Sequence, residues 1–214
     1  MKFRILILLF VFSVFGYSQY TESEWNDRDD WMRISDFFEI TKVQKGNVIA
    51  DIGCHEGYMS IHLAKRVGEN GKIYAVDLKK YRLDALEKNA KNRGIENIST
   101  VLGDYDNPKL PINIFDAIYI IDTYHEIEDY HEVLEHVNKS LKPNGKLILL
   151  EKLKSRIKGK PRRQQVEAHS LASKYVKKEL QEAGFKIEYE ESNFGLWERN
   201  PGKQIWFVIA VPNN

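Results

Sequence analysis

The chain has 214 residues, of which 43% are hydrophobic and 29% charged, and its formal net charge is +1. This length and composition predict one ordinary globular domain with a full core, and the charge balance indicates no particular partner. The single cysteine, Cys54, excludes an intramolecular disulfide and a zinc site built from several thiolates.

The amino terminus has the layout of a secretory signal peptide. Two cations within residues 1–4 precede an apolar run over residues 5–15, and small residues stand before a candidate cleavage point at Gln19. The apolar run is shorter than the roughly 20 residues of a membrane span. We expect residues 1–18 to be a signal peptide or a retained membrane anchor, and the protein to be exported, periplasmic or membrane-associated. A buried amino-terminal helix or strand is the alternative.

Residues 19–45 are predicted to form an amino-terminal cap region. Apolar side chains recur there at helical spacing: Trp31, Ile34, Phe37 and Phe38. This pattern predicts one amphipathic helix within residues 20–40 that packs over the core.

Strand and helix patterns alternate through residues 46–214, which we expect to form the main domain. Strands are expected at residues 48–51, 72–77, 97–102, 115–122, 146–151, 185–190 and 204–211, helices at 58–67, 80–93, 128–141 and 164–183, and a turn at 142–145. The alternation predicts an α/β fold with a doubly wound, mostly parallel sheet of seven strands. The last two strands lack a helix between them, which predicts an antiparallel strand at the end.

The first strand ends in Asp51 and passes through a turn with Gly53 and Gly57 into a helix. Strand, glycine turn and helix together form ligand-binding crevices at the carboxyl end of a parallel sheet. Gly53 would let the backbone turn tightly and approach a ligand, and Gly57 would let the helix begin close to the strand.

Acids stand at or just beyond the ends of four predicted parallel strands: Asp51, Asp77, Asp104 and Asp122. These strand ends line one crevice in such a sheet. Carboxylates there suit hydrogen-bond donors, such as ribose hydroxyls, an amino group or a sulfonium-bearing amino acid. Each acid could instead cap a helix, but four at equivalent places favour a shared binding site.

The spacing of Asp51, Gly53 and Gly57 resembles motif I of the class I S-adenosylmethionine (SAM)-dependent methyltransferases. Gly103-Asp104-Tyr105 resembles the Gly-Asp motif of that family, and residues 141–151 resemble its Leu-Lys-Pro-Gly-Gly motif, with Asn144 in place of one glycine. In this order the motifs extend the resemblance over roughly residues 28–211. The chain looks most like the ubiquinone/menaquinone-biosynthesis type, also described as methyltransferase-11-like, and like small bacterial methyltransferases with Asp-Thr-Tyr-His after strand four. The resemblance implies a Rossmann-like fold and SAM as the cofactor.

The resemblance also implies cofactor-binding roles. It assigns the methionine end of SAM to Asp51, Gly53, His55 and Gly57, the ribose to Asp77, and the adenine to Leu78, Asp104 and Tyr105. His55 departs from the family, which usually has glycine there. Its side chain could crowd the carboxypropyl end of SAM, or it could point outward and form a hydrogen bond to it.

Residues 122–132 concentrate histidines and acids. The resemblance places Asp122 opposite the methyl group, and Tyr124 or His125 would position the acceptor or act as general base. Methyl transfer from a sulfonium is an in-line displacement, so alignment can supply most of the acceleration. A metal site is an alternative, built from His125, Glu128, Asp129 and His131. Such spacing is more often a solvated helix face, and we expect no metal.

A basic run over residues 152–163 follows the fifth strand. It could attract an anionic substrate or a membrane surface, or it could be a solvated loop. No aromatic residue interleaves with these cations, which disfavours nucleic-acid binding.

We therefore expect an exported SAM-dependent methyltransferase with a small-molecule acceptor. One alternative is a non-catalytic exported module of the same fold that binds SAM or a nucleoside, as would follow if His55 closed the site. A nicotinamide oxidoreductase is less well supported, because Gly53-x-x-x-Gly57 is not Gly-x-Gly-x-x-Gly and the Asp51 carboxylate would sit poorly beside a pyrophosphate.

Overall fold

The computed structural model of the protein describes residues 22–213. The predicted signal segment, residues 1–18, lies outside the described residues, so that prediction stays open. Within residues 22–213 no helix has both the length and the apolar character needed to cross a membrane.

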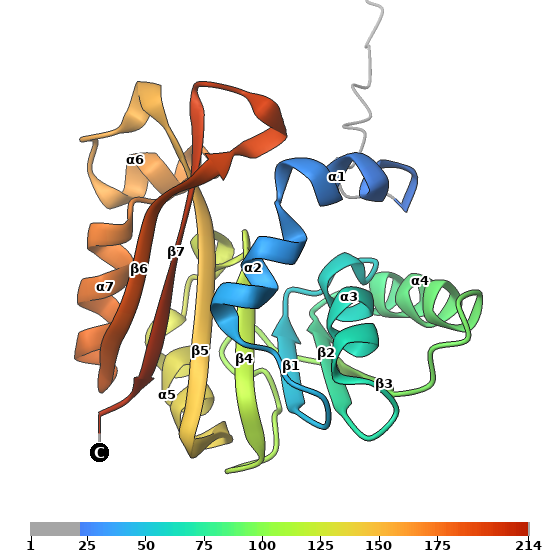
Figure 1. Ribbon diagram of the computed structural model, residues 1–214. Coiled ribbons are helices and arrows are strands. Elements are labelled where there is room, and N and C mark those ends of the chain that lie inside the picture. Colours follow the sequence, from blue (N-terminus) through green and yellow to red (C-terminus); the bar gives the residue numbers. More distant parts are fainter. Residues whose placement is uncertain (1–21, 214) are drawn as a thin grey trace, which may run out of the picture.

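Seven strands form one sheet in the order β3-β2-β1-β4-β5-β7-β6 (Figure 1). Their bounds are β1 Val48–Ile52, β2 Lys72–Asp77, β3 Ile98–Leu102, β4 Phe115–Ile121, β5 Leu141–Lys154, β6 Phe185–Leu196 and β7 Lys203–Pro212. Strands β1 to β5 pair in parallel, and β7 is antiparallel to both of its neighbours. The predicted α/β fold, with a mostly parallel sheet and an antiparallel last strand, is confirmed.

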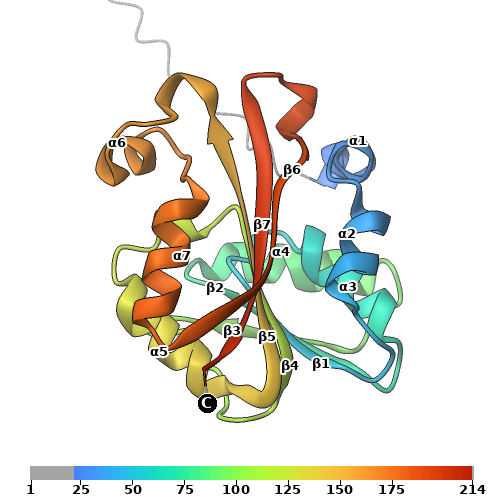
Figure 2. The ribbon, with the colours of Figure 1, turned by 60° about the vertical axis from the view of Figure 1, so that its left-hand side comes forward.

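Helices cover both faces of the sheet (Figure 2). The described helices are α1 Trp25–Trp31, α2 Ile34–Thr41, α3 Tyr58–Val67, α4 Lys80–Lys91, α5 Tyr130–Ser140, α6 Arg162–Glu167 and α7 Ser173–Glu182, with 3-10 turns η1 Glu22–Glu24, η2 Tyr124–Glu126, η3 Ser155–Ile157 and η4 Trp197–Arg199. Successive residues of β1 point to opposite faces of the sheet. Ile49 belongs to the core beneath α2 and α3, whereas Ala50 and Ile52 belong to the core beneath α5 and α7. This burial on both faces explains why β1 is apolar up to Asp51, near its carboxyl end.

The amino-terminal cap is two helices, not the single helix expected. Arg33 separates α1 from α2 and has a left-handed backbone with φ of 48°, which ends helical geometry there. The break gives the two helices different positions: Trp31 of α1 packs on Trp197 with ring centroids 4.6 Å apart, while Phe37 of α2 packs against Phe207 of the sheet. As a result α1 crosses above the sheet and α2 lies along its face (Figure 1).

The long helix expected at residues 164–183 is also two helices. His169, with φ of 49°, lies between α6 and α7. Ser170 explains the interruption, because its hydroxyl donates to the Lys152 carbonyl at 2.8 Å and accepts from the Lys154 amide at 2.9 Å. These bonds to β5 hold residues 168–172 out of a continuous helix.

The basic run over residues 152–163 is not one surface loop. Its first three residues continue β5 and pair with β7, and Lys152 is buried. The expected turn at 142–145 is an irregularity within β5, since Leu141 and Lys146 pair with β4 on either side of it. The apolar pattern located the centre of this strand correctly but not its two ends.

Replacing Phe37 should show how strongly the cap is anchored. Phe37 is fully buried, and its ring centroid lies 5.1 Å from that of Phe207 and 5.9 Å from that of Phe194. We expect Phe37→Ala to lower the free energy of unfolding in urea by about 3–5 kcal/mol, because it leaves a cavity in an aromatic cluster. Ile112, which is 70% exposed, provides the control: Ile112→Ala should change stability by less than about 0.5 kcal/mol. Equal effects of the two substitutions would contradict this assignment.

Candidate active site

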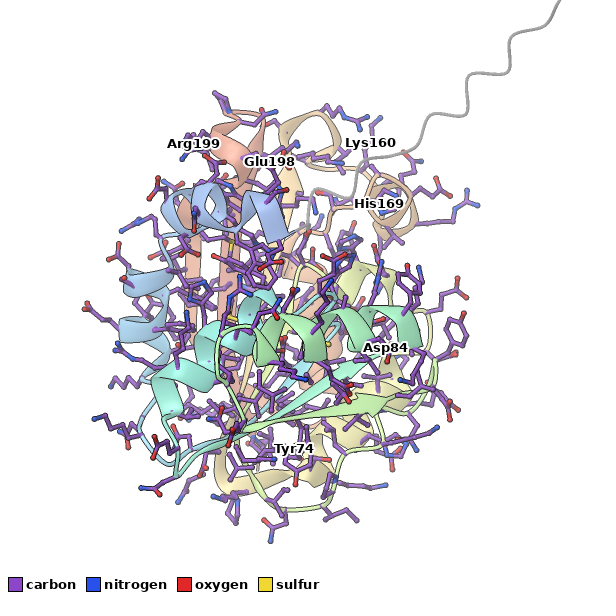
Figure 3. All side chains as sticks on the ribbon, turned by 90° about the vertical axis from the view of Figure 1, so that its right-hand side faces the viewer. Tyr74, Asp84, Lys160, His169, Glu198 and Arg199 are labelled. Atoms are coloured by element: carbon purple, nitrogen blue, oxygen red, sulfur yellow. The ribbon has the colours of Figure 1, made fainter. Side chains whose placement is uncertain are left out.

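A cavity of about 390 Å³ lies at the carboxyl ends of β1, β2 and β4. Arg28 of α1 forms part of its wall. Figure 3 shows Glu198 and Arg199 beside α1, with Lys160 and His169 across from them. The cavity wall includes eight of the residues predicted for the site: Asp51, Gly53, His55, Asp77, Leu78, Asp104, Tyr105 and Asp122. The four strand-end acids therefore converge on one cavity.

The two glycines of the first turn are required by close packing. Gly53 has φ of 80°, and a Cβ atom there would lie 2.3 Å from the side chain of Thr123. Gly57 has φ of 98°, and its Cβ atom would lie 2.6 Å from Cγ of Leu86 in α4. Gly53 thus lets the β4 loop approach the turn, whereas Gly57 lies behind the cavity wall and lets α3 and α4 pack together.

His55 occupies a left-handed backbone conformation, with φ of 50°. This geometry accounts for the glycine usual at the position, since it costs less for glycine than for other residues. The His55 amide donates to Oδ2 of Asp77 at 3.1 Å. Burial and the nearby Arg82 lower the pKa of the imidazole to about 4, so it is neutral near pH 7. His55 lines the cavity together with Asp51 and Leu78.

Asp51 is almost fully buried at the end of β1. Its Oδ2 atom accepts a hydrogen bond from Oγ of Ser60 at 2.6 Å. Burial raises its pKa to about 6, against the opposing effects of Ser60 and of the positive charge on Arg28. A carboxylate held in so little solvent gains much from a bound cation, which makes it a natural partner for an ammonium group.

Asp77, at the end of β2, is held in place by backbone donors. The amides of His55 and Lys79 donate to its two carboxylate oxygens at 3.1 and 2.9 Å, and Nη1 of Arg82 lies 3.4 Å from Oδ2. Its side chain is therefore fixed at the cavity wall before any ligand arrives.

The far end of the cavity is more open. Leu78 and Tyr105 are 43% and 78% exposed, and both face this part of the wall. Asp104 is also exposed, and its carboxylate lies 2.9 Å from Nζ of Lys109. Two apolar surfaces with one acceptor beside them suit a flat base with an exocyclic amine.

Asp122 forms a buried ion pair at the end of β4. The ammonium of Lys152 donates to both of its carboxylate oxygens, and that ammonium also lies 4.6 Å from the centroid of the Trp197 ring. The backbone at Asp122 is left-handed, with φ of 52°, where the strand ends. The pair leaves a carboxylate with a fixed orientation in the cavity wall.

His125 forms a second buried ion pair, with Glu151 at the end of the central part of β5. Its Nδ1 atom lies 2.9 Å from Oε2 of Glu151, and its backbone amide donates to Oε1 at 3.0 Å. Burial lowers the pKa of His125, but the charge and hydrogen bond of Glu151 outweigh burial, so the pKa lies above its usual 6.5. His125 does not itself line the cavity; its neighbour Glu126 does, and Oε1 of Glu126 lies 3.8 Å from Nε2 of His125.

Comparison with known proteins agrees with this geometry. The methyltransferase domain family matches residues 43–184. The chain belongs to this family. The demethylmenaquinone methyltransferase of Geobacillus sp. (strain WCH70) is 32% identical over 116 residues, which are 54% of this chain and 50% of that protein. The ubiquinone/menaquinone biosynthesis C-methyltransferase UbiE of Azotobacter vinelandii is 28% identical over 122 residues, 56% of this chain and 47% of that protein.

The fold is shared with solved methyltransferase structures. A SAM-dependent methyltransferase from Aquifex aeolicus superposes with a TM-score of 0.71 at 23% identity, covering 90% of this chain and 99% of that one. The chain spans about half the length of the curated relatives it matches. The predictions of a class I SAM-dependent methyltransferase and of SAM as its cofactor are confirmed at the level of the family, while the acceptor is not identified.

Within this methyltransferase domain, Tyr124 does not reach the cavity. Its side chain is fully buried in the core beside α5 and α7, and its hydroxyl donates to Oε2 of Glu179 at 3.0 Å. Tyr124 therefore holds η2 against α7, and of the three residues predicted to be catalytic only Asp122 lines the cavity.

The residues considered for a metal site are not brought together. Among residues 22–213, the groups of potential ligands that include His125 join it to Glu126 and His169, or to Asp122 and Glu151. In the second group, Lys152 already neutralises Asp122, and His125 itself pairs with Glu151.

Sequence reasoning missed Glu151, Lys152 and Arg28. Glu151 follows the apolar stretch of a parallel strand, as Asp51 and Asp77 do, so the same rule could have found it. Lys152 was part of a basic run that looked like a surface segment. Arg28 carried no signal, because only the position of α1 places its guanidinium in the cavity wall.

The raised pKa of Asp51 predicts that cofactor affinity depends on pH. We expect the dissociation constant of S-adenosylhomocysteine, measured by calorimetry, to rise about tenfold from pH 7 to pH 5, because protonation removes the charge that pairs with the ligand ammonium. Asp51→Asn should bind more weakly at pH 7 and lose this dependence. A wild-type affinity that stayed constant across pH 5–7 would contradict the assignment.

Protonation of Asp51 should stabilise the folded protein, whereas it weakens cofactor binding. The folded-state pKa of Asp51 lies above its usual 3.8, so the folded protein binds a proton more readily than the unfolded chain. The stability contributed by this protonation is present on the acid side and is lost as the pH rises through about 6. Comparing urea unfolding of the wild type and Asp51→Asn at pH 5 and 7 separates this effect from cofactor binding.

Proposed function

We propose that the protein is a SAM-dependent methyltransferase that acts on a small-molecule acceptor. The observation that carries the proposal is the convergence of Asp51, Asp77, Asp104 and Asp122 on one cavity. Four acids around one ligand site favour a cationic, phosphate-free nucleoside. The comparisons give no support to a nicotinamide oxidoreductase or to a non-catalytic module.

The cavity fits the cofactor in size and in chemistry. Its volume of about 390 Å³ lies within the range of about 300–1,000 Å³ that is usual for small-molecule sites. Asp51 would bind the ammonium group, Asp77 the ribose hydroxyls and Asp104 the adenine amine, with Leu78 and Tyr105 against the base. The positions of the first two are set before binding by hydrogen bonds from Ser60, His55 and Lys79.

When bound, SAM supplies a methyl group activated by the sulfonium charge. The protein's main task is then to align the acceptor with that methyl group, which can lower the barrier by several kcal/mol. Asp122 suits this place, since Lys152 holds its carboxylate rigid at the end of β4. Lys152 balances the negative charge of Asp122. The Asp122 carboxylate therefore still has a counter-charge after the methylated product has left.

His125 and Glu151 supply the means to remove a proton from the acceptor. Glu151 fixes Nδ1 of the imidazole, which leaves Nε2 directed toward Glu126 at the cavity wall. We propose that Nε2 receives the acceptor proton through Glu126, whose side chain lines the cavity. A base of this kind is needed where the acceptor atom carries a proton to lose.

The acceptor proposal takes its direction from the relatives. One is named for demethylmenaquinone and the other for ubiquinone/menaquinone biosynthesis, but each match covers only about half of either protein. We propose a small organic acceptor with an acidic hydroxyl or ring carbon. The exposed cations Lys158, Lys160 and Arg163 would attract an anionic acceptor or a membrane surface.

Cofactor binding can be tested with one matched pair of variants. We expect calorimetry to show S-adenosylhomocysteine binding to the wild type, and Asp77→Asn to weaken it by about 10- to 100-fold, because hydrogen bonds to a charged group are lost. Asp84→Asn, on the exposed side of α4 (Figure 3), should bind like the wild type. Lack of wild-type binding, together with binding of NADH, would refute the proposed function.

The proton-transfer role has its own signature. With an acceptor that loses a proton, the rate of label transfer from methyl-labelled SAM should rise with pH above 6.5, because His125 becomes neutral only there. His125→Asn should lower the rate by about 10²- to 10⁴-fold and flatten the profile. Glu151→Gln should move the midpoint to lower pH, since it removes the charge that raises the His125 pKa. If the midpoint of the pH profile did not move, the His125–Glu151 pair would have a structural role only.

A further inference from the structure

The cap contributes one cation to the cofactor cavity. Arg28 of α1 is 7% exposed and lines the same cavity as Asp51. Its Cζ atom lies 4.1 Å from the ring centroid of Tyr58, 5.7 Å from that of Trp31 and 5.6 Å from that of Trp197. Stacking of this kind stabilises a buried guanidinium and fixes its plane, while the N–H groups stay in that plane and can face a ligand.

Arg28 and Asp51 place opposite charges at one end of the cavity. The positive charge of Arg28 lowers the pKa values of both Asp51 and His55, so these groups interact electrostatically. His55 is neutral near pH 7. The same cavity wall also carries Asp77 and Arg82, which already lie 3.4 Å apart (Oδ2 to Nη1). Opposite charges on the wall of one cavity, both on buried residues, match the ammonium and carboxylate of an α-amino acid.

The position of α1 is fixed by contacts with α3. Oδ1 of Asp29 accepts from the Tyr58 hydroxyl at 2.8 Å and lies 2.8 Å from Nε2 of His62. At the other side, Nη1 of Arg199 lies 2.6 Å from Oδ1 of Asp27. These contacts hold the helix that carries Arg28 over the end of the cavity where Asp51 lies.

We propose that Arg28 binds the α-carboxylate of the cofactor's methionyl group while Asp51 binds its α-ammonium. The amino-terminal cap is then part of the cofactor site, and cofactor binding further stabilises α1. The assignment rests on the proposed function, since it names a further contact of the same site. It also gives α1 a role that a packing helix lacks.

A pair of ligands separates this role from packing. S-adenosylhomocysteine carries the amino-acid group, and 5′-methylthioadenosine has the same nucleoside and sulfur without it. We expect Arg28→Gln to weaken S-adenosylhomocysteine by about 10- to 100-fold in calorimetry and to change 5′-methylthioadenosine by less than threefold. Arg28→Lys, which keeps the charge but loses the planar guanidinium, should fall between the wild type and Arg28→Gln for the first ligand.

Arg33→Gln is the matched control, because Arg33 lies between α1 and α2 and pairs with Asp36 away from the cavity. It should leave both affinities within threefold of the wild type. Hydrogen exchange should show the α1 amides protected by S-adenosylhomocysteine in the wild type and not in Arg28→Gln.

Three outcomes would overturn the assignment. Equal weakening of both ligands by Arg28→Gln would make Arg28 a packing residue. Unchanged S-adenosylhomocysteine affinity with slower transfer to an anionic acceptor would assign the guanidinium to the acceptor, leaving the proposed function intact. Failure of the wild type to bind either nucleoside would refute the proposed function, and this assignment with it.

Discussion

Three carboxylates are buried at the ends of neighbouring parallel strands, and each needs donors or a counter-charge to remain ionised. Asp51, Asp77 and Asp122 come close together because β1 lies between β2 and β4 in a parallel sheet. Water cannot solvate them well, so the protein must supply their partners. Much of the structure above the sheet is arranged to meet this requirement.

The three carboxylates are stabilised in different ways. Asp77 relies on backbone amides of its own and the neighbouring turn, an arrangement that local chain geometry can provide. Asp122 needs a full cation, and Lys152 reaches it from the extension of β5. Burial raises the pKa of Asp51, and hydrogen bonds from Ser60 together with the charge of Arg28 do not fully offset it. Asp51 is therefore the carboxylate with most to gain from a cationic ligand.

This difference divides the cavity by chemistry. The end near Asp51 is enclosed and charged, because α1 covers it, whereas the end near Leu78 and Tyr105 is open and largely apolar. A ligand with a zwitterionic tail and a flat base would be oriented by this contrast alone. The ion pair of His125 and Glu151 lies close to Asp122, so the proton transfer that we propose would take place at the Asp122 side of the cavity.

The sequence by itself determined the alternating strands and helices, the strand-end acids and the two turn glycines. Periodicity and glycine are local signals, and the parallel sheet follows from the order of elements. It did not determine where Tyr124 and His125 point, because the left-handed backbone at Asp122 ends the alternation of β4. Nor did it show that Arg28 and Lys152 face the site. Contacts between residues so far apart in the chain depend on how helices and strands pack, and only the tertiary structure decides them.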